Sequence, residues 1–296
     1  MDDLSFLPLL DNLDHEILMH RDAHFSGSFT LMIDYYQKEG KGAHPDITIK
    51  RLKELERLEK RTNMNLSDLV LTDGEKEEVG RSKNMYLSLR ELYESKEPLE
   101  IPRLIADLIL SEDDPPAKEI ANLKANGSPV ITPLIDLLAS FDFYNPIFPG
   151  YGHAPALAAK TLGQMNDERA VIPLFEALGN GDFHMEETVL EALSHLEEKS
   201  RDFLLKALMR LPITKDNERA AVALLGFKED PSLSKAFLNM LVDEKSHAFP
   251  TFSTYLILGC GGLGGEDRKR FIELSKQPYF SSDLHQEMDL IIKKWN

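Results

Sequence analysis

The clearest pattern of apolar and polar positions lies in residues 154–178. Apolar and small side chains recur there at the spacing of one helical face, first over 157–165 and again over 171–178. They are Leu157, Ala158, Thr161, Leu162 and Met165 in the first half, and Val171, Leu174, Phe175 and Leu178 in the second. Asn166 and Asp167 separate the two sets and favour a turn or a helix cap. The pattern predicts two short amphipathic helices joined by a tight turn.

Related segments recur about every thirty residues along the chain. The leucines that align in them are Leu108, Leu138, Leu178, Leu208 and Leu241, at steps of 30, 40, 30 and 33 residues. Two short helices cannot cover both of their apolar faces alone, so each pair needs neighbours of the same kind. The long step indicates that one repeat carries an insertion.

The turn Asn-Asp-Glu-Arg-Ala at 166–170, followed by Val-Ile-Pro-Leu-Phe, resembles the bacterial HEAT-like repeat family, which includes the repeats of phycobilisome lyases. The resemblance covers residues 98–276 and does not extend to the first 95 residues. It implies an all-α fold, a right-handed α-solenoid of HEAT-like helical pairs. It also implies a binding scaffold more than any one activity, because only a few members of the family act on a substrate.

The N-terminal region predicts helices of its own, at 15–38, 47–61 and 75–95. Ser26-Gly27-Ser28 could divide the first of them in two, because glycine weakens a helix and serine favours a cap. We therefore expect an N-terminal helical domain at 1–97 and a repeat solenoid at 98–296. A last amphipathic helix, 283–295, is expected to cap the array.

Composition points to a protein of the cytoplasm. Apolar residues make up 42% and charged residues 28% of the 296, and no apolar run approaches the roughly 20 residues that a membrane span needs. The N-terminus is acidic and lacks the basic start of a signal peptide. The single cysteine, Cys260, excludes an intramolecular disulfide. We expect a cytoplasmic protein that does not bind membranes.

The formal net charge of −16 opposes nucleic-acid binding, which needs a basic surface, and favours a basic protein partner. One local cluster has the opposite sign and consists of Lys50, Arg51, Lys53, Arg57, Lys60 and Arg61. Glu54, Glu56 and Glu59 alternate with it. This arrangement indicates a solvated helix face with ion pairs between residues one turn apart.

Histidines near the N-terminus suggest metal chemistry. His15-Glu16 and His20 form H-E-x-x-x-H, which differs from the H-E-x-x-H of zinc proteases and sets the two rings about 140° apart on a helix. His20 and His24 are one turn apart with Asp22 between them, and the three make a candidate metal site that would need further ligands. The alternative is a polar helix face that meets solvent or another helix.

The insertion at 141–153, FDFYNPIFPGYGH, combines aromatic residues with two prolines. The residues that we expect to bind a partner are Phe143, Tyr144, Phe148, Tyr151 and His153, because aromatic side chains on a stiff loop offer a large contact area. In that case, replacing Tyr144 and Phe148 with alanine would weaken binding and leave thermal stability nearly intact. Alternatively, the loop folds back and covers apolar surface.

No strong catalytic motif is present. The glycine-rich stretch 259–265 lacks the lysine and the preceding strand of a phosphate-binding loop, and is expected to end a helix. Cys260 within it has no basic neighbour in the sequence that would activate a thiol. We therefore expect a protein–protein interaction scaffold that uses the solenoid groove and the loop 141–153, with no cofactor. The alternative is a metal-dependent or lyase-like enzyme that uses His20, Asp22 and His24.

Overall fold

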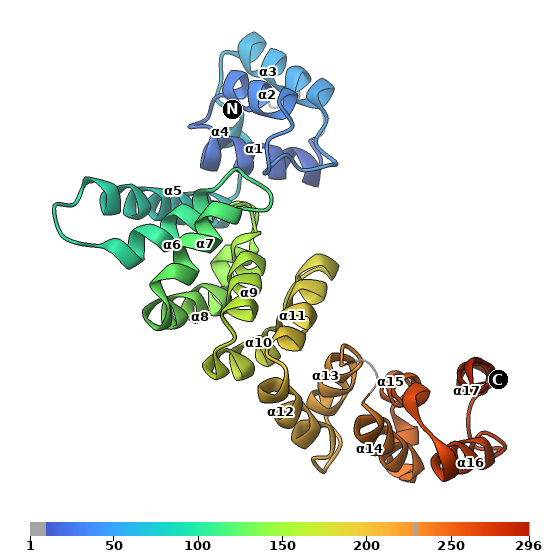
Figure 1. Ribbon diagram of the computed structural model, residues 1–296. Helices are drawn as coiled ribbons and strands as arrows, with labels where there is room; N and C mark the ends of the chain where they lie inside the picture. The colour runs from blue at the N-terminus through green and yellow to red at the C-terminus, as the bar shows by residue number, and fades with distance from the viewer. Residues whose placement is uncertain (1–9, 228–229, 296) are drawn as a thin grey trace. The chain divides into compact units, whose positions relative to one another are not determined.

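The computed structural model describes residues 10–227 and 230–295 (Figure 1). All regular elements of this described part are helices, and none of its residues lies in a strand, which confirms the all-α class. No helix within these two ranges is long and apolar enough to cross a membrane.

The chain forms two compact units, Met1–Ala158 (unit 1) and Ala159–Asn296 (unit 2), which divide inside helix α9 (Ala154–Met165). The predicted boundary at residue 97 lies within unit 1, in the link between α5 (Asp73–Glu94) and α6 (Glu100–Leu110). These two helices contact each other. The assignment of separate domains at 1–97 and 98–296 stays a prediction.

Unit 1 begins with a helix that breaks where the sequence allows it. A capping box between Asp11 and Asp14 starts α1 (Asn12–His24), and α2 (Phe29–Gln37) starts at Ser28, whose side chain accepts a hydrogen bond from the Leu31 amide. Gly27 between them has a φ of 77°, which suits glycine. The remaining helices of the unit are α3 (Ile49–Thr62), α4 (Leu66–Val70), α5, α6, α7 (Ala117–Asn126) and α8 (Ile131–Ala139).

The N-terminal helices share one apolar core. Helix α1 packs on α4 and α5, and α2 packs on α3. Two residues far away in the sequence, Ile147 and Phe148, belong to the same core. Arg21 crosses it with only 1% of its surface exposed, and its guanidinium donates to Glu59 at 2.8 Å and to Ser67 at 2.8 Å. A buried charge needs such partners, so Arg21 ties α1 to α3 and α4.

The two helices predicted at 154–178 are present. Helix α9 and α10 (Val171–Ala177) are joined by a turn in which Asn166 has a φ of 50°, and Asp167 caps a short 3-10 helix (Glu168–Ala170). The other helices of unit 2 are α11 (Phe183–His195), α12 (Glu198–Leu208), α13 (Lys215–Leu224), α14 (Pro231–Val242), α15 (Pro250–Gly259), α16 (Gly265–Leu274) and α17 (Ser282–Lys294).

Helices of unit 2 pack in pairs and also with the second helix along the chain. The pairs include α10 with α11, α12 with α13, and α14 with α15. In addition, α11 contacts α13, α13 contacts α15, and α15 contacts α17. The predicted last helix corresponds to α17, which buries Leu284, Met288 and Ile291 as its pattern requires. Each helix therefore finds cover for its apolar face from near neighbours in the sequence.

Gly163 sets how closely α9 and α11 approach. A Cβ added to Gly163 would lie 2.6 Å from the Cα of Ala192 on α11, and backbone cannot move aside as a flexible side chain can. Gly80 inside α5 differs, since nothing lies within 4 Å of the same position. The two glycines have the same helical backbone and opposite surroundings.

We predict opposite effects for Gly163→Ala and Gly80→Ala on unfolding by urea. Alanine is the better helix former by about 1 kcal/mol, so Gly80→Ala should raise the free energy of unfolding by roughly 0.5–1 kcal/mol. Gly163→Ala should lower it, because overpacking costs typically about 1–3 kcal/mol and exceeds that gain. A Gly163→Ala protein as stable as the Gly80→Ala protein would contradict the close approach of α9 and α11.

Candidate functional site

The loop 141–153 folds onto the N-terminal helices. It begins with a 3-10 turn, Phe141–Tyr144, in which the Tyr144 hydroxyl donates to the Leu138 carbonyl at 2.9 Å. Phe148 is 1% exposed and Phe141 is 79% exposed. Of the two interpretations of this loop, the structure shows the one in which it covers apolar surface. The surface that it covers belongs to α1 and α5, and Phe148 is a core residue that a partner cannot reach.

Side chains of α1 and α5 satisfy the polar atoms of this loop. The Ser82 hydroxyl donates to the Ile147 carbonyl at 2.6 Å, and His24 Nε2 lies 2.8 Å from the Pro146 carbonyl oxygen. Arg81 pairs with Asp142 at 2.9 Å. Buried backbone carbonyls require partners of this kind. The loop is therefore built into unit 1 and does not stand out from it.

Tyr151 closes a cluster of aromatic and histidine side chains. Its ring centroid lies 4.6 Å from that of His24 and 6.0 Å from those of His20 and Tyr35. A Cβ added to Gly42 would overlap the Tyr151 ring, and one added to Gly40 would overlap the Tyr35 ring. The glycines of the 40–42 loop thus let two tyrosine rings lie directly on the backbone. We call these rings, with Tyr36 and Tyr86, the histidine–tyrosine cluster.

Burial keeps both histidines of this cluster neutral. It lowers the pKa of His20 to about 3, with further lowering from the nearby His24 and His44, and it lowers the pKa of His24 to about 4. A neutral His24 that donates from Nε2 to Pro146 can accept at Nδ1 from the Tyr86 hydroxyl, 2.7 Å away. His20 Nε2 is buried without a hydrogen-bond partner among the described residues.

The candidate metal site His20, Asp22 and His24 does not form. Both ring nitrogens of His24 are engaged, and the Asp22 carboxylate pairs with Arg21 at 2.7 Å. Side chains two residues apart on a helix point about 200° apart around its axis. Asp22 therefore lies on the opposite side of α1 from the face that His20 and His24 share. Over the described ranges, no three His, Cys, Asp or Glu side chains come together in a way that could hold a metal ion. The metal hypothesis is corrected accordingly.

The structure does not bring the remaining predicted contact residues, Phe143, Tyr144 and His153, together in one site. His153 is exposed, Tyr144 is half-buried against α8, and Phe143 is half-buried in its 3-10 turn. Sequence reasoning missed Tyr35, Tyr36 and Tyr86, which complete the cluster around the histidines. The glycines at 40 and 42 were the available signal, because they permit close approach of a ring.

The glycine-rich stretch behaves as a helix end. Helix α15 ends at Gly259, where a Cβ would overlap the Phe237 ring. The Gly261 carbonyl accepts from Trp295 Nε1 at 2.8 Å. Cys260 is fully buried, and burial raises the pKa of its thiol. These residues serve packing, and the thiol is not activated.

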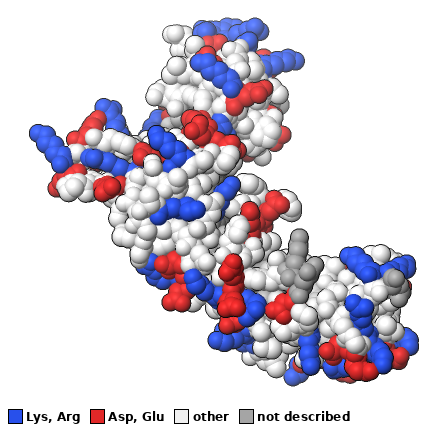
Figure 2. Space-filling model, viewed as in Figure 1, with Lys and Arg blue, Asp and Glu red and all other residues white. Residues whose placement is uncertain are grey.

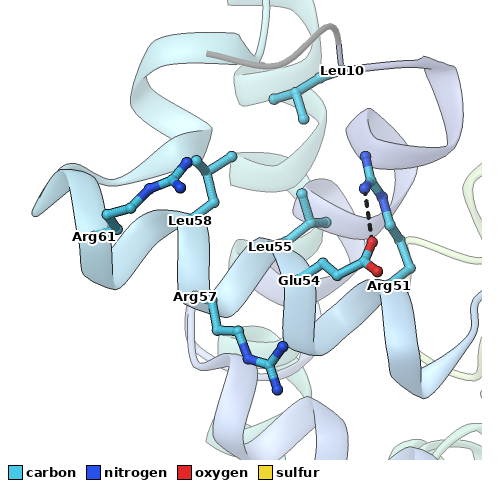
Figure 3. A pocket seen from close by; sticks show the side chains of 7 residues that line it. All are labelled: Leu10, Arg51, Glu54, Leu55, Arg57, Leu58 and Arg61. Atoms are coloured by element: carbon cyan, nitrogen blue, oxygen red, sulfur yellow. Dashed lines mark hydrogen bonds and ion pairs between the residues drawn. The ribbon is translucent and has the colours of Figure 1, made fainter. Parts of the chain in front are cut away.

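Helix α3 carries a small hollow with a charged rim (Figure 3). Leu55 and Leu58 project from α3 toward Leu10, and Arg61 extends beside Leu58. The hollow has a volume of about 230 Å³. Figure 2 shows Lys and Arg side chains gathered at the end of unit 1 that carries α3.

One edge of unit 2 exposes large apolar side chains. Leu211, Pro212 and Ile213 line a cleft of about 460 Å³ together with Lys245 and Phe249. His247 stacks on Tyr279 at 4.8 Å, which continues this edge to the next connector. The exposed fractions are 49% for Met209, 54% for Leu211, 41% for Phe249 and 49% for Tyr279. We call these four residues the apolar edge; Leu211 and Phe249 of this set line the same cleft.

Comparison with protein-family models and with curated proteins finds no match for this chain. The resemblance to HEAT-like repeats therefore stays a prediction from the sequence.

We predict that Phe148→Ala destabilises unit 1, in contrast to the expectation from the sequence. Removal of a fully buried phenylalanine lowers the free energy of unfolding by about 3–5 kcal/mol. Phe141→Ala, at an exposed position of the same loop, should change it by less than about 0.5 kcal/mol. Urea denaturation measures both variants, and equal effects would show that Phe148 is not buried.

We predict that the free energy of unfolding of unit 1 decreases as the pH is lowered from about 6.5 to about 4. In this window an unfolded histidine binds a proton and His20 in the folded protein does not, so each step to lower pH favours the unfolded chain. His20→Leu should flatten the slope of unfolding free energy against pH by about 1 kcal/mol per pH unit. An unchanged slope in that variant would mean that His20 is not a buried neutral group.

Proposed function

We propose that the protein is a scaffold that binds a partner protein, and that its C-terminal part is a right-handed α-solenoid of HEAT-like pairs. The packing in unit 2, where most helices contact a sequence neighbour and the helix two places along, supports this architecture. Within unit 1, α6 follows the same rule with α7 and α8. The array would thus start at α6, close to the residue 98 expected from the sequence.

The apolar edge carries the proposal. In a stack of helical pairs, the connectors within successive pairs come to the same edge, where their side chains can act together. Large side chains that are half exposed each stabilise a complex by roughly 1–2 kcal/mol when a partner covers them, on the scale of complete side-chain burial. The cleft between Leu211 and Phe249 would receive an apolar anchor of the partner.

The partner that fits this edge has an apolar anchor and a net positive charge. The net charge of −16 attracts basic proteins over long range and speeds their association, while the apolar contacts hold the complex. We assign no contact to the loop 141–153, because Phe148 is buried and the loop is bonded to α1 and α5 within unit 1. No observation on the described residues favours metal-dependent or lyase-like chemistry.

We predict that Leu211→Ser with Phe249→Ser abolishes partner binding. The full-length protein and this double variant would be used for affinity capture from the cell's own extract, with quantitative mass spectrometry of the bound proteins. A stoichiometric partner should be lost by at least about tenfold, since two anchor residues contribute more than about 1.4 kcal/mol together.

The matched control is Ile172→Ser with Leu290→Ser, at positions that are 53% and 51% exposed and lie outside the apolar edge. This variant loses the same amount of exposed apolar surface and should keep the partner. Retention of the partner by both double variants, or its loss from both, would refute the role of the apolar edge.

A further inference from the structure

We propose that the hollow on α3 binds an acidic peptide segment that inserts one apolar side chain. This site lies in unit 1 and uses none of the residues of the apolar edge, so it is independent of the scaffold proposal. Leu10, Leu55 and Leu58 provide its apolar lining, and Arg57 and Arg61 are its outer residues. Arg61 extends beside Leu58, and the Arg57 guanidinium points to the side of α3 away from Leu10 (Figure 3).

The cations of α3 fall into two groups. Three of the six are held by carboxylates: Arg51 by Asp14 at 2.6 Å and Glu54 at 3.1 Å, Lys60 by Glu56 at 2.8 Å, and Lys50 by Glu54 at 4.0 Å. These residues confirm the ion pairs that the sequence predicts along this helix.

The other three, Lys53, Arg57 and Arg61, are four residues apart from one another. They therefore share one face, and no carboxylate of the described residues lies within ion-pair distance of them. All three side chains are exposed. The chain has 50 acidic residues, yet none of its described carboxylates forms an ion pair with this row of three cations. The row is therefore a local feature that favours an anionic partner.

The spacing of the two arginines fits carboxylates on a helix. Arg57 and Arg61 are separated by about 6 Å along the axis of α3, from a rise of about 1.5 Å per residue. Glutamates at i and i+4 of a partner helix have the same separation. Guanidinium groups bind carboxylates through paired hydrogen bonds, which fixes the register of such a segment.

The volume and lining of the hollow favour a peptide side chain over a small molecule or a nucleic acid. About 230 Å³ is smaller than the roughly 300–1,000 Å³ of small-molecule sites, and it suits a single side chain of a peptide. A nucleic acid would contact the cations and would leave the leucine side chains of the hollow exposed to solvent. An acidic peptide with a leucine uses both the charge and the apolar lining.

One side of the hollow, formed by Arg51 and Glu54, is held in place before any partner arrives. Asp14 is fully buried, and both of its carboxylate oxygens accept from Arg51, at 2.7 and 2.6 Å. These hydrogen bonds raise the pKa of Arg51. Arg51 and Lys50 together offset the charges of Asp14 and Glu54, which reduces the repulsion of an acidic peptide by Glu54. A site that is already ordered loses less entropy on binding.

The test measures binding of a fluorescent, amidated helical peptide to the full-length protein by anisotropy. The probe carries Glu at i and i+4 and Leu at i+3 and i+7, which places all four on one face. Measurement at about 0.15 M salt screens the overall negative charge of the protein beyond about 8 Å, so that local contacts dominate.

Arg57→Gln with Arg61→Gln should weaken the probe at least about tenfold, because two charge-assisted contacts are lost. The matched control, Lys50→Gln with Lys60→Gln, removes the same charge from the same helix at residues that are already paired, and should change the affinity less than about twofold. A probe with Gln for Glu, or Ser for Leu, should bind at least about tenfold more weakly to the unaltered protein.

Equal weakening by the two double variants would overturn the proposal, because it would reduce the site to long-range attraction. Absence of probe binding, or tighter arginine-dependent binding of inorganic phosphate, of a single-stranded oligonucleotide or of vesicles with anionic lipid, would overturn it as well. Leu211→Ser with Phe249→Ser should leave probe binding unchanged, so failure here and failure of the scaffold proposal are separate results. Circular dichroism confirms that every variant is folded.

Discussion

The structure of unit 1 depends on how a buried loop satisfies its backbone. Ile147 and Phe148 enter the core of the N-terminal helices, and this takes the carbonyl of Ile147 out of water. A buried carbonyl needs a donor, and the Ser82 hydroxyl provides it. His24 holds the exposed end of the same segment at the Pro146 carbonyl. It can donate to Pro146 and accept from Tyr86 only as a neutral imidazole, so the neutrality of this buried histidine is part of how the loop is held.

This constraint also decides where recognition can take place. The aromatic residues that would attract a partner on a free loop are used to hold unit 1 together. The surfaces that we propose for partners are two others, the apolar edge of unit 2 and the hollow on α3. Their characters differ, since the first offers apolar area and the second combines arginine with a small apolar hollow.

Glycine has one role in several parts of this chain. At Gly42, Gly163 and Gly259 the missing Cβ lets a ring or another helix approach the backbone. In the glycine-rich stretch 259–265, Gly259 and Gly262 belong to this group, while nothing lies within 4 Å of a Cβ added to Gly264 or Gly265. Close packing between short helices demands such positions, because a helix of about ten residues buries little area unless it approaches closely.

By itself, the sequence determined the elements of this protein. Apolar spacing indicated the helices at 154–165, 171–177 and 282–294 within three residues, and the serines around Gly27 indicated where the first helix breaks. These features are local, since periodicity and caps act within a few residues. Only the tertiary structure decided that Phe148 is buried, that Asp22 turns to Arg21, and that Tyr35, Tyr86 and Tyr151 gather around His20 and His24. Those outcomes depend on contacts between residues up to 131 positions apart, as for His20 and Tyr151, which no local pattern encodes.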